Sequence, residues 1–463
     1  MVLYGSMRVI NKFLGRFKKD KSSLNGVGNS TVYQGEPLIT PRSEHNISRS
    51  MINKSALQVL YGLKDAGFEA YLVGGCVRDL LLGYEPKDFD VATNASPEQV
   101  NTVFRRSRLI GRRFKLVHVR FGRDIIEVAT FRAPPKKSDS HVDEKGRIVR
   151  DNVYGTLEQD AWRRDFTINA LYYSISDFSI IDYTGGMDDL KAGQIRLIGN
   201  VETRYREDPV RILRAIRFVG KLGLKLDAET ERLIPVLANL LTDIPAARLF
   251  DEILKLFLSG QGLTTYELLT HYDVFSALFP QTGELLHHEY NGFPRVLLAN
   301  ALANTDSRIA EGKPVTPAFL FAALLWEPVR QRWAYHQQKI PAIPALQKAA
   351  GEIIESQVER VAIPRRFTVV TKDIWVMQVR LGQRRGKRAF RVLSHPKFRA
   401  AYDFLLLRSE SGEQELTELA AWWTRFQEET IEEQQNMVNS IAPAGNDKKR
   451  PRRRHRKKPE AKS

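Results

Sequence analysis

The sequence predicts an α+β fold in which an N-terminal head, a small β-sheet flanked by helices, is followed by an all-helical C-terminal region. Two observations lead to this prediction. Short apolar segments with the alternation typical of strands occur before Arg196, and beyond it apolar residues recur at helical spacing to about Met437. The 463 residues suffice for roughly three domains. No run of apolar residues approaches the ~20 that a membrane span needs.

The chain is strongly basic, with 71 Lys and Arg against 54 Asp and Glu and a net charge of +17. Such an excess favours a polyanionic partner, because binding neutralises phosphates and releases their counterions. Cys76 is the only cysteine. This excludes a disulfide scaffold and a cysteine-built zinc or iron–sulfur site, and it fits a reducing compartment. The N-terminus lacks the solid apolar core of a secretory signal.

We expect a flexible basic arm at each end, over residues 1–50 and 441–463. Residues 1–21 are amphipathic and basic and are predicted to be a frayed arm, with a helix on a membrane surface as the alternative. Residues 448–462 hold ten Lys or Arg and one Glu, and without a large apolar residue they cannot bury a core. We interpret this tail as an electrostatic arm for RNA, DNA or an anionic membrane. A solubility tail or a localisation signal is the alternative reading.

The periodicity between the arms divides the chain into a head at 51–195, a helical neck at 196–255 and a helical body at 256–440. The head is predicted to begin with a helix over 53–67. Its predicted strands are 69–73, 89–92, 109–121, 125–131 and 180–183, with a helix at 77–82, a polar loop at 134–149 and helical spacing over 162–172.

Asp88 and Asp90, separated by Phe89, form the first candidate site. On a strand both carboxylates point to the same face, roughly 6–7 Å apart. They repel each other unless a cation lies between them, and Mg²⁺ suits such a pair because it also takes substrate phosphates and water. Alone, the pattern is a weak signal, and a solvated strand edge would then be the preferred interpretation.

A glycine pair precedes these aspartates. Gly74 and Gly75 join an apolar strand to the helix over 77–82. Such a turn lets backbone N–H groups approach an anion at a helix N-terminus. A tight turn that needs glycine for its backbone angles is the alternative interpretation.

Glu127 supplies a third carboxylate, isolated within a β-branched run that predicts a buried strand. A buried lone glutamate is unfavourable unless a cation or hydrogen bonds compensate it. If this strand lies beside 89–92, Glu127 joins the two aspartates around one or two Mg²⁺ ions. A salt bridge to Arg120 or Arg132 is the alternative.

Six motifs now appear in order along the chain: GGCVRDLLLG, DFDVAT, EVATFR, RRDFTINAL, DYTGGMDDL and EDPVRILRAIRF. Together, over residues 71–226, they resemble the class II template-independent nucleotidyltransferases, which include tRNA CCA-adding enzymes and bacterial poly(A) polymerases. The segment LIGRRFKLVHV at 109–119 resembles the one that marks the poly(A) branch. The helical C-terminal region and the basic tail resemble that branch too.

The resemblance implies a role for each matching residue. Asp88 and Asp90 would bind the metal ions, and Glu127 would complete the carboxylate cluster. Arg164 and Asp165 would contact the ribose of the nucleotide, with Asp165 also a candidate catalytic residue. Gly74, Gly75 and Arg78 would hold the phosphates. Asp208 and Arg211 would read the edge of the base, and Arg214 is a further nucleotide-binding candidate.

Residues of a basic segment at 380–399 are the candidates for RNA contact in the body. The segment contains eight Lys or Arg and no acid, with Phe390, His395 and Phe398 interleaved. Cations with stackable rings suit single-stranded RNA, and a solvated basic helix whose rings face the core is the alternative. The candidate RNA-binding residues are Arg384, Arg385, Lys387, Arg388 and Arg391, and in the tail Arg452, Arg453 and Arg454.

The resemblance therefore implies an enzyme that adds AMP from ATP to RNA 3′ ends without a template, using two Mg²⁺ ions, with Mn²⁺ as an alternative ion. Its activity would promote RNA decay in the bacterial cytoplasm, with RNA-decay proteins as further partners. A tRNA CCA-adding enzyme stays open, because an Asp–Arg pair can read adenine or cytosine. A non-catalytic RNA-binding module is the second alternative, disfavoured because all three carboxylates are present.

Overall fold

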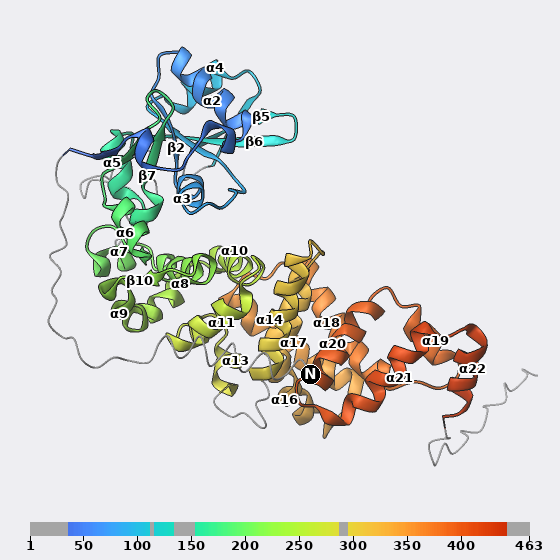
Figure 1. Ribbon diagram of the computed structural model, residues 1–463. Helices are drawn as coiled ribbons and strands as arrows, with labels where there is room; N and C mark the ends of the chain where they lie inside the picture. The colour runs from blue at the N-terminus through green and yellow to red at the C-terminus, as the bar shows by residue number, and fades with distance from the viewer. Residues whose placement is uncertain (1–35, 112–114, 134–152, 287–294, 442–463) are drawn as a thin grey trace, which may run out of the picture.

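The computed structural model describes residues 36–111, 115–133, 153–286 and 295–441. A sheet-containing head forms one end of the molecule, and helices extend away from it to α19 and α22 (Figure 1). This confirms the predicted α+β class. The predicted polar loop at 134–149 lies outside the described residues, as do the tail arginines at 452–454.

The head is built on an eight-stranded sheet with the order β1-β8-β7-β2-β3-β6-β5-β4. Strands β3 and β6 pair in parallel, and their neighbours pair in antiparallel fashion. The strands are β1 (Leu38–Thr40), β2 (Ala70–Val73), β3 (Asp90–Thr93), β4 (Ser107–Ile110), β5 (Leu116–Phe121), β6 (Asp124–Thr130), β7 (Leu171–Ser174) and β8 (Ile180–Asp182). The predicted strand over 109–121 is thus two antiparallel strands, β4 and β5.

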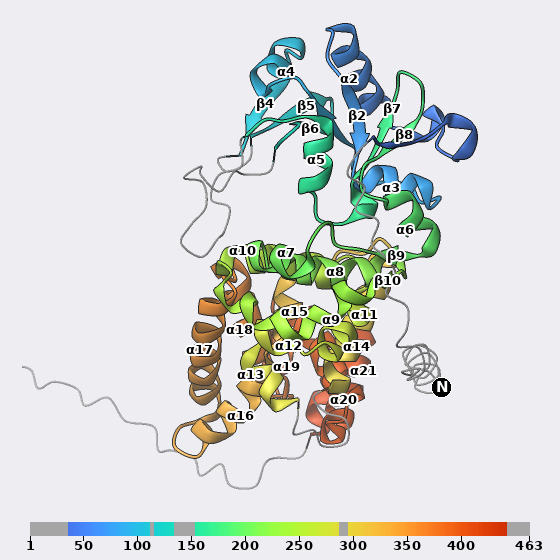
Figure 2. The same cartoon turned by 90° about the vertical axis from the view of Figure 1, so that its left-hand side faces the viewer.

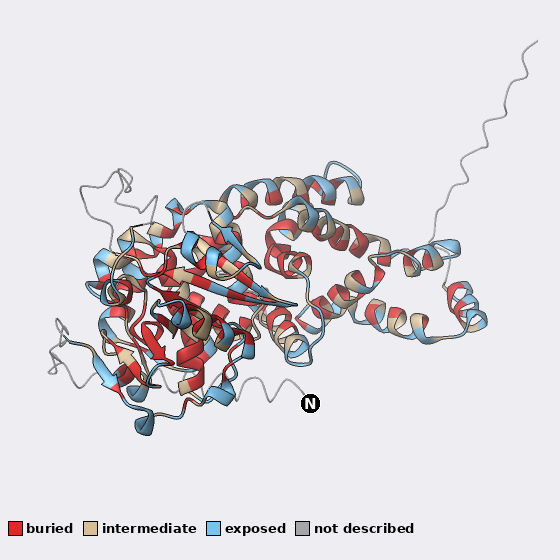
Figure 3. Cartoon of the chain, turned by 90° about the horizontal axis from the view of Figure 1, so that it is seen from above, coloured by how far each residue is buried: buried red, intermediate tan, exposed pale blue. Residues whose placement is uncertain are grey.

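Helices cover the two faces of this sheet unequally. On one face, Val91, Val119 and Val128 pack in a core with helices α2 (Lys54–Asp65), α3 (Gly75–Leu81) and α4 (Pro97–Val103). On the other face, α5 (Leu157–Arg163) packs over the central strands through Ala161. Figure 2 shows α5 in front of the sheet and α2 on its far side, and Figure 3 shows the buried interior of the head from above. The outer strands β4 and β5 lack a described helix on the α5 side.

The prediction of a flexible arm up to residue 50 is wrong for residues 36–50. Strand β1 pairs with β8 at the edge of the sheet, two 3-10 turns follow at η2 (Arg42–Glu44) and η3 (Arg49–Met51), and Ile47 is fully buried in the head core. A three-residue strand and one apolar anchor are too short to show periodicity within a polar segment. Residues 1–35, including the predicted basic arm, lie outside the described residues.

The helical spacing predicted over 162–172 is also wrong. Helix α5 ends at Arg163, a 3-10 turn follows at η4 (Thr167–Asn169), and β7 begins at Leu171. All four residues of β7 are buried in the middle of the sheet. A strand buried on both faces loses the alternation that identifies it in the sequence.

The neck and body are helical apart from two short strands, β9 (Gln194–Ile195) and β10 (Lys225–Leu226), which pair in parallel. One core runs from Phe166 through the neck to Leu407, and a second, smaller core closes the C-terminal helices. The helices from neck to tail are α6 (Gly186–Ala192), α7 (Val201–Glu207), α8 (Val210–Leu222), α9 (Ala228–Leu237), η5 (Ala238–Asp243), α10 (Ala246–Phe257), α11 (Gly262–His271), α12 (Phe275–Leu278), α13 (Pro280–Leu285), α14 (Arg295–Ala310), α15 (Pro317–Leu324), α16 (Trp326–Gln337), α17 (Ala342–Arg360), α18 (Arg365–Leu381), α19 (Lys387–Leu393), α20 (Phe398–Glu410), η6 (Gln414–Leu416), α21 (Thr417–Glu428) and α22 (Ile431–Asn439). Within the described ranges, every helix is too short or too polar to cross a bilayer.

The DYTGGMDDL motif proves to be a structural turn. The buried carboxylate of Asp182 accepts hydrogen bonds from the backbone N–H groups of Thr184, Gly185 and Met187, and so fixes the start of α6. Asp189 then accepts a hydrogen bond from Thr167 at 2.6 Å. The motif therefore fastens α6 to the η4 turn, which follows the candidate site residues Arg164 and Asp165 in the chain.

Close packing at Gly186 gives a first prediction. A Cβ at this position would lie 2.3 Å from the carbonyl oxygen of Thr167. Gly186→Ala should therefore lower the free energy of unfolding by about 1–3 kcal/mol, because the packed turn must shift. Gly351→Ala is the matched control: it lies within α17 with open space around it, so it should raise stability by about 0.5–1 kcal/mol. Urea denaturation of both variants measures the difference, and equal effects would show that α6 is not packed as described.

Candidate active site

The glycine turn lies where β2 ends and α3 begins. Gly74 adopts a φ of 78°, a left-handed conformation that other residues rarely adopt. The guanidinium Nη1 of Arg164 lies 3.5 Å from the position that a Gly74 Cβ would occupy. The predicted strand-to-helix turn is thus confirmed. Arg164, to which the resemblance assigns a contact with the ribose, lies directly beside it.

Strand register places two of the three carboxylates beside this turn. Val73, the last residue of β2, pairs with Asp90 on β3, and Asp90 pairs with Glu127 on β6. Asp88 precedes β3 and is exposed, so it is not on the strand as expected. Burial, with the charges of Glu127 and Asp88, raises the pKa of Asp90 to about 6, although Arg164 acts in the opposite direction.

Glu127 differs from its prediction in burial and in partner. Its side chain is 49% exposed, and its carboxylate lies 3.1 Å from Nε2 of His118 on β5. The predicted buried glutamate, with Arg120 or Arg132 as its alternative partner, is therefore wrong. Only one face of β6 is buried. Because apolar β-branched residues occur on both faces of this strand, the sequence does not show the alternation between buried and exposed positions.

The carboxylates were tested for their fit to a metal ion. Across the described ranges, no group of three or more His, Cys, Asp or Glu side chains is arranged to hold one. The predicted three-residue cluster is therefore not formed among the described residues. Asp90 and Glu127 are paired, and Asp88 is close enough to act on Asp90 electrostatically. No described side chain donates a hydrogen bond to the Asp90 carboxylate. A partly buried, unpaired carboxylate beside a second one fits Mg²⁺, which needs only one or two.

Arg164 is held rigidly beneath the glycine turn. Its Nε donates to the hydroxyl of Tyr172 at 2.9 Å and to Asp160 at 3.1 Å, and its Nη2 donates to Asp160 at 2.9 Å. The Tyr172 hydroxyl in turn donates to Asp160 at 2.7 Å. Only Nη1 has no hydrogen-bond partner among the described residues, and this atom faces Gly74. The sequence analysis missed Asp160, a buried acid on α5. It also missed Tyr172, which lies on β7 within the segment that was predicted to be helical.

Asp165 links the head to the neck. Its carboxylate accepts hydrogen bonds from Asn169 at 3.3 Å and from Arg214 on α8 at 2.6 Å. Burial acts to raise the pKa of Asp165, but Arg214 together with hydrogen bonds from Phe166 and Asn169 lowers it to about 2. Asp165 and Asn169 are thus in contact although residues 162–172 do not form the predicted helix. Arg214 is thereby committed to an ion pair.

Arg78 does not lie where a phosphate would meet it. The residue is 2% exposed. Its guanidinium donates to Asp79 at 2.6 and 2.8 Å and to Asn169 at 2.5 Å, and it lies over the ring of Phe218 on α8. This arginine packs at the joint of head and neck. A sequence motif alone does not distinguish a buried arginine from a ligand-facing one.

The candidate base-reading residues lie at the start of α8. Asp208 accepts a hydrogen bond from Arg248 on α10 at 2.6 Å, and its other oxygen, Oδ1, is buried without a partner in the described chain. Arg211 donates through Nη1 to Glu207 at 3.2 Å. Arg204 on α7 joins the neck to the head, because it donates hydrogen bonds to the backbone oxygens of Arg163 and Arg164. It also donates to Glu207. Sequence reasoning missed Arg204 and Arg248.

The basic segment of the body is exposed, but its rings are not. Arg385, Lys387, Arg388 and Arg391 are exposed on and beside α19, whereas Arg384 lies over the ring of Trp422. Phe390 packs against Phe426 and Phe398 against Trp423 in the C-terminal core. The prediction that Phe390 and Phe398 are available for stacking is wrong, because they complete this core.

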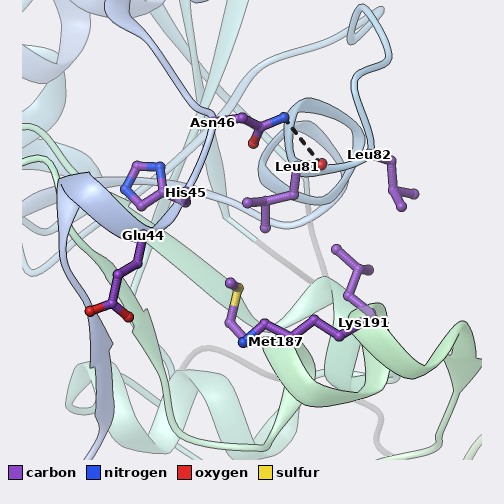
Figure 4. A pocket seen from close by; sticks show the side chains of 8 residues that line it. Glu44, His45, Asn46, Leu81, Leu82, Met187 and Lys191 are labelled. Carbon is purple, nitrogen blue, oxygen red and sulfur yellow. Dashed lines mark hydrogen bonds between the residues drawn. The ribbon is translucent and has the colours of Figure 1, made fainter.

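A separate pocket of about 280 Å³ lies between the N-terminal segment, α3 and α6 (Figure 4). Its lining includes Glu44, Leu81, Met187 and Lys191 but none of the candidate site residues. His45 beside it has both ring nitrogens satisfied, by Phe178 O and by the N–H of Ile47. This pocket therefore plays no part in the candidate site.

Three family models match the chain. They are the poly A polymerase head domain over residues 70–196, the probable RNA and SrmB-binding site of polymerase A over 223–286, and the polymerase A arginine-rich C-terminus over 338–458. Among solved structures, the Thermotoga maritima CCA-adding enzyme complexed with tRNA gives a TM-score of 0.57 at 21% identity, covering 88% of this chain and 92% of that one. This likeness shows the fold alone.

Curated relatives extend over nearly the whole chain. Poly(A) polymerase I of Escherichia coli O6:H1 is 49% identical over 436 residues, which cover 92% of this chain and 94% of that protein. The Haemophilus influenzae protein of the same name is 47% identical over 409 residues, covering 85% and 90%. A CCA-adding enzyme of Lactobacillus delbrueckii subsp. bulgaricus is 39% identical over 222 residues, covering 48% and 54%.

Fold and relatives together define a nucleotidyltransferase enzyme. The chain belongs to the poly(A) polymerase family, whose members polyadenylate without a template. The resemblance carried by the six motifs is thereby confirmed.

Two adjacent tyrosines test how Arg164 is held. Tyr172→Phe removes the hydroxyl shared by Arg164 and Asp160, so it should lower the free energy of unfolding by about 1–3 kcal/mol. Tyr173→Phe is the matched control, because the Tyr173 hydroxyl is buried without a hydrogen-bond partner in the described structure, and its loss should be neutral or stabilising. Thermal or urea denaturation measures both. A Tyr172→Phe variant as stable as the control would argue against the network.

Proposed function

We propose that this protein transfers AMP from ATP to the 3′-hydroxyl of RNA and releases pyrophosphate. The observation that carries the proposal is the strand register that puts Asp90 and Glu127 beside the Gly74 turn, in a chain whose near-full-length relatives are poly(A) polymerases. In the reaction the 3′-oxygen forms a bond to the α-phosphorus, the bond from that phosphorus to the pyrophosphate oxygen breaks, and the hydroxyl proton leaves to solvent.

The metal requirement is part of the proposal. Asp88 and Asp90, with Glu127 beside them, would hold Mg²⁺, or Mn²⁺ as the alternative ion. When bound, two ions supply charge neutralisation for the triphosphate and a lower pKa for the attacking hydroxyl. The raised pKa of Asp90 and its lack of hydrogen-bond donors support a cation at this position.

The remaining residues would bind and orient the nucleotide. The turn at Gly74 and Gly75 would approach the phosphates; since the N–H of Gly74 already donates to the backbone oxygen of Leu171 at 3.4 Å, the N–H of Gly75 is the candidate donor. The free Nη1 of Arg164 and the Asp165 carboxylate would contact the ribose. Asp208, whose Oδ1 has no partner among the described groups, would accept a hydrogen bond from the base amino group, and Arg211 would donate to a ring nitrogen. Arg214 would act through Asp165, which it positions.

We also propose how RNA contacts the body and what the reaction does in the cell. RNA would contact the body through the basic segment around α19 and the tail arginines, the latter outside the described residues. The outcome would be 3′-polyadenylation that promotes RNA decay in the bacterial cytoplasm, with RNA-decay proteins as partners. Contact of the N-terminal arm with a membrane is a further proposal, and that arm also lies outside the described residues.

A primer-extension assay tests the proposed reaction. Purified protein, Mg²⁺ and a short arbitrary RNA should give long products with ATP and little extension with CTP. CCA addition is the second candidate because a CCA-adding relative is 39% identical over 222 residues; it predicts extension that needs CTP, is confined to tRNA ends and stops after three nucleotides. A binding module predicts no incorporation.

Substitutions at the carboxylates test the site itself. Asp88→Ala or Asp90→Ala should lower kcat by a factor of about 100 or more, since removing one catalytic charge contributor typically costs several kcal/mol. Folding should be preserved, because Asp90 accepts no hydrogen bond from a described side chain. Asp65→Ala, an exposed acid at the end of α2, is the control and should retain activity. More than a few per cent of wild-type kcat in both site variants would remove these residues from the site.

A different substitution at Asp90, to asparagine, should change how the stability depends on pH in a metal-free buffer. Burial and like charge raise the pKa of Asp90 from 3.8 to about 6, so the folded state loses stability as pH rises through this window. Asp90→Asn should therefore match the wild type near pH 4 and exceed its stability above about pH 6. Urea midpoints against pH, with EDTA present, measure this; a constant difference would contradict the electrostatic account.

Removing the tail tests its role as an RNA arm. Deletion of residues 448–463 should weaken RNA binding and flatten its salt dependence, because fewer phosphate contacts release fewer counterions. The KM for ATP should hardly change, since the nucleotide site lies in the head and neck. Fluorescence anisotropy at several salt concentrations measures the slope, and an unchanged slope would show that the tail does not contact RNA.

A further inference from the structure

We propose that the open face of β4, β5 and β6 binds the phosphate backbone of the RNA next to its 3′ end. This inference rests on the proposed function, because it uses the carboxylate pair as the point that the RNA 3′-hydroxyl reaches. The contacting groups would be the guanidinium groups of Arg106, Arg108 and Arg120.

Strand register forms a row of charged side chains across four neighbouring strands. Asp90 on β3 pairs with Glu127 on β6, Glu127 with His118 on β5, and His118 with Arg108 on β4. Directly paired residues project from the same face of a sheet. Strands lie about 4.8 Å apart, so Arg108 is roughly 14 Å from Asp90. Along this row the side chains change from acidic to basic, away from the candidate active site.

A second pair of arginines flanks this row. The N–H of Arg120 donates to the backbone oxygen of Arg106 at 2.9 Å, which extends the β4–β5 ladder by one pair beyond Ser107 and Val119. Residues two apart on a strand share a face, so Arg106 and Arg120 project beside Arg108. All three arginines are exposed, and none bonds through its guanidinium group to another residue of the described chain. They form an open cationic patch.

The described part of the chain leaves this face uncovered. The opposite face packs through Val117, Val119 and Val128 into the core under α2 and α4, and α5 covers only the central strands on the near face. Ile125 and Ile110, on the same face as the arginines, are 43% and 38% exposed. Exposed aliphatic side chains among unpaired cations indicate a binding surface.

Nucleic acid fits this surface better than an acidic protein does. Guanidinium groups bind phosphate oxygens through paired hydrogen bonds, and aliphatic side chains between them can contact ribose and base. The row also starts at the carboxylates, where the substrate hydroxyl must be held for the proposed reaction. A strand entering along this row would present its phosphates to arginines and its terminal hydroxyl to Asp90 and Glu127.

Paired variants test the surface in the full-length protein. The double variant Arg108→Ala/Arg120→Ala should raise the Kd for a short fluorescent RNA at least about fivefold and reduce the slope of log K against log salt by about 1.4, the value for two single-strand phosphate contacts. The KM for ATP should stay within about twofold, because neither arginine belongs to the candidate nucleotide site. Lys54→Ala/Lys64→Ala removes the same charge from exposed positions on α2, across the sheet, and should change neither quantity.

The position of the contact is tested with neutral linkages in the RNA. Methylphosphonates at the linkages nearest the 3′ end should weaken binding to the wild type and have little further effect on the arginine variant. Equal RNA affinity and equal salt slope for the arginine and lysine variants would overturn the inference. This holds even if the arginine variant no longer bound an acidic protein, the alternative occupant of this surface. Binding is measured without turnover, so absence of AMP incorporation by the wild type would contradict the proposed function separately.

Discussion

Two carboxylates held side by side by backbone register are the constraint on which the site depends. Asp90 and Glu127 are paired directly across β3 and β6, although like charges in this position destabilise a sheet. Apolar neighbours maintain the pair, because Val91 and Val128 pack in the core on the other face. A slip of β6 by one residue would bury Glu127 and expose Val128. Burial, and after it the charge of Glu127, raises the pKa of Asp90 to about 6.

The second feature of the site is that arginines join its two halves. The ribose motif belongs to the head and the base-reading residues to the neck, and Arg214 pairs with Asp165 across this boundary. At the same joint Arg204 of the neck donates to the backbone oxygens of Arg163 and Arg164, and Arg78 of the head lies over the ring of Phe218 on α8. Removing one partner of a buried pair leaves an uncompensated charge. These links therefore fix the distance between ribose-binding and base-binding groups, which a nucleotide needs to be held at both ends.

The sequence predicted the fold class and the strands on either side of the carboxylates, because β2, β3 and β6 have strong apolar runs bounded by turns. It also predicted the Gly74 turn and the adjacency of Asp90 and Glu127. It failed at β1, which is too short to show a period, and at β7, which is buried on both faces. It could not show which arginines face a ligand. Arg78, Arg211 and Arg214 all lie in motifs that the resemblance assigns to the nucleotide, yet tertiary contacts pair them with Asp79 and Asn169, with Glu207, and with Asp165, respectively.

The most direct test of the account is to locate a divalent ion in crystals. Crystals grown with Mn²⁺ and a non-hydrolysable ATP analogue should show anomalous scattering peaks within coordination distance of the Asp90 carboxylate, on the side that faces Gly74 and Glu127. A well-ordered analogue whose Mn²⁺ peaks lie away from Asp90 and Glu127 would contradict the central claim that this carboxylate pair holds the ions.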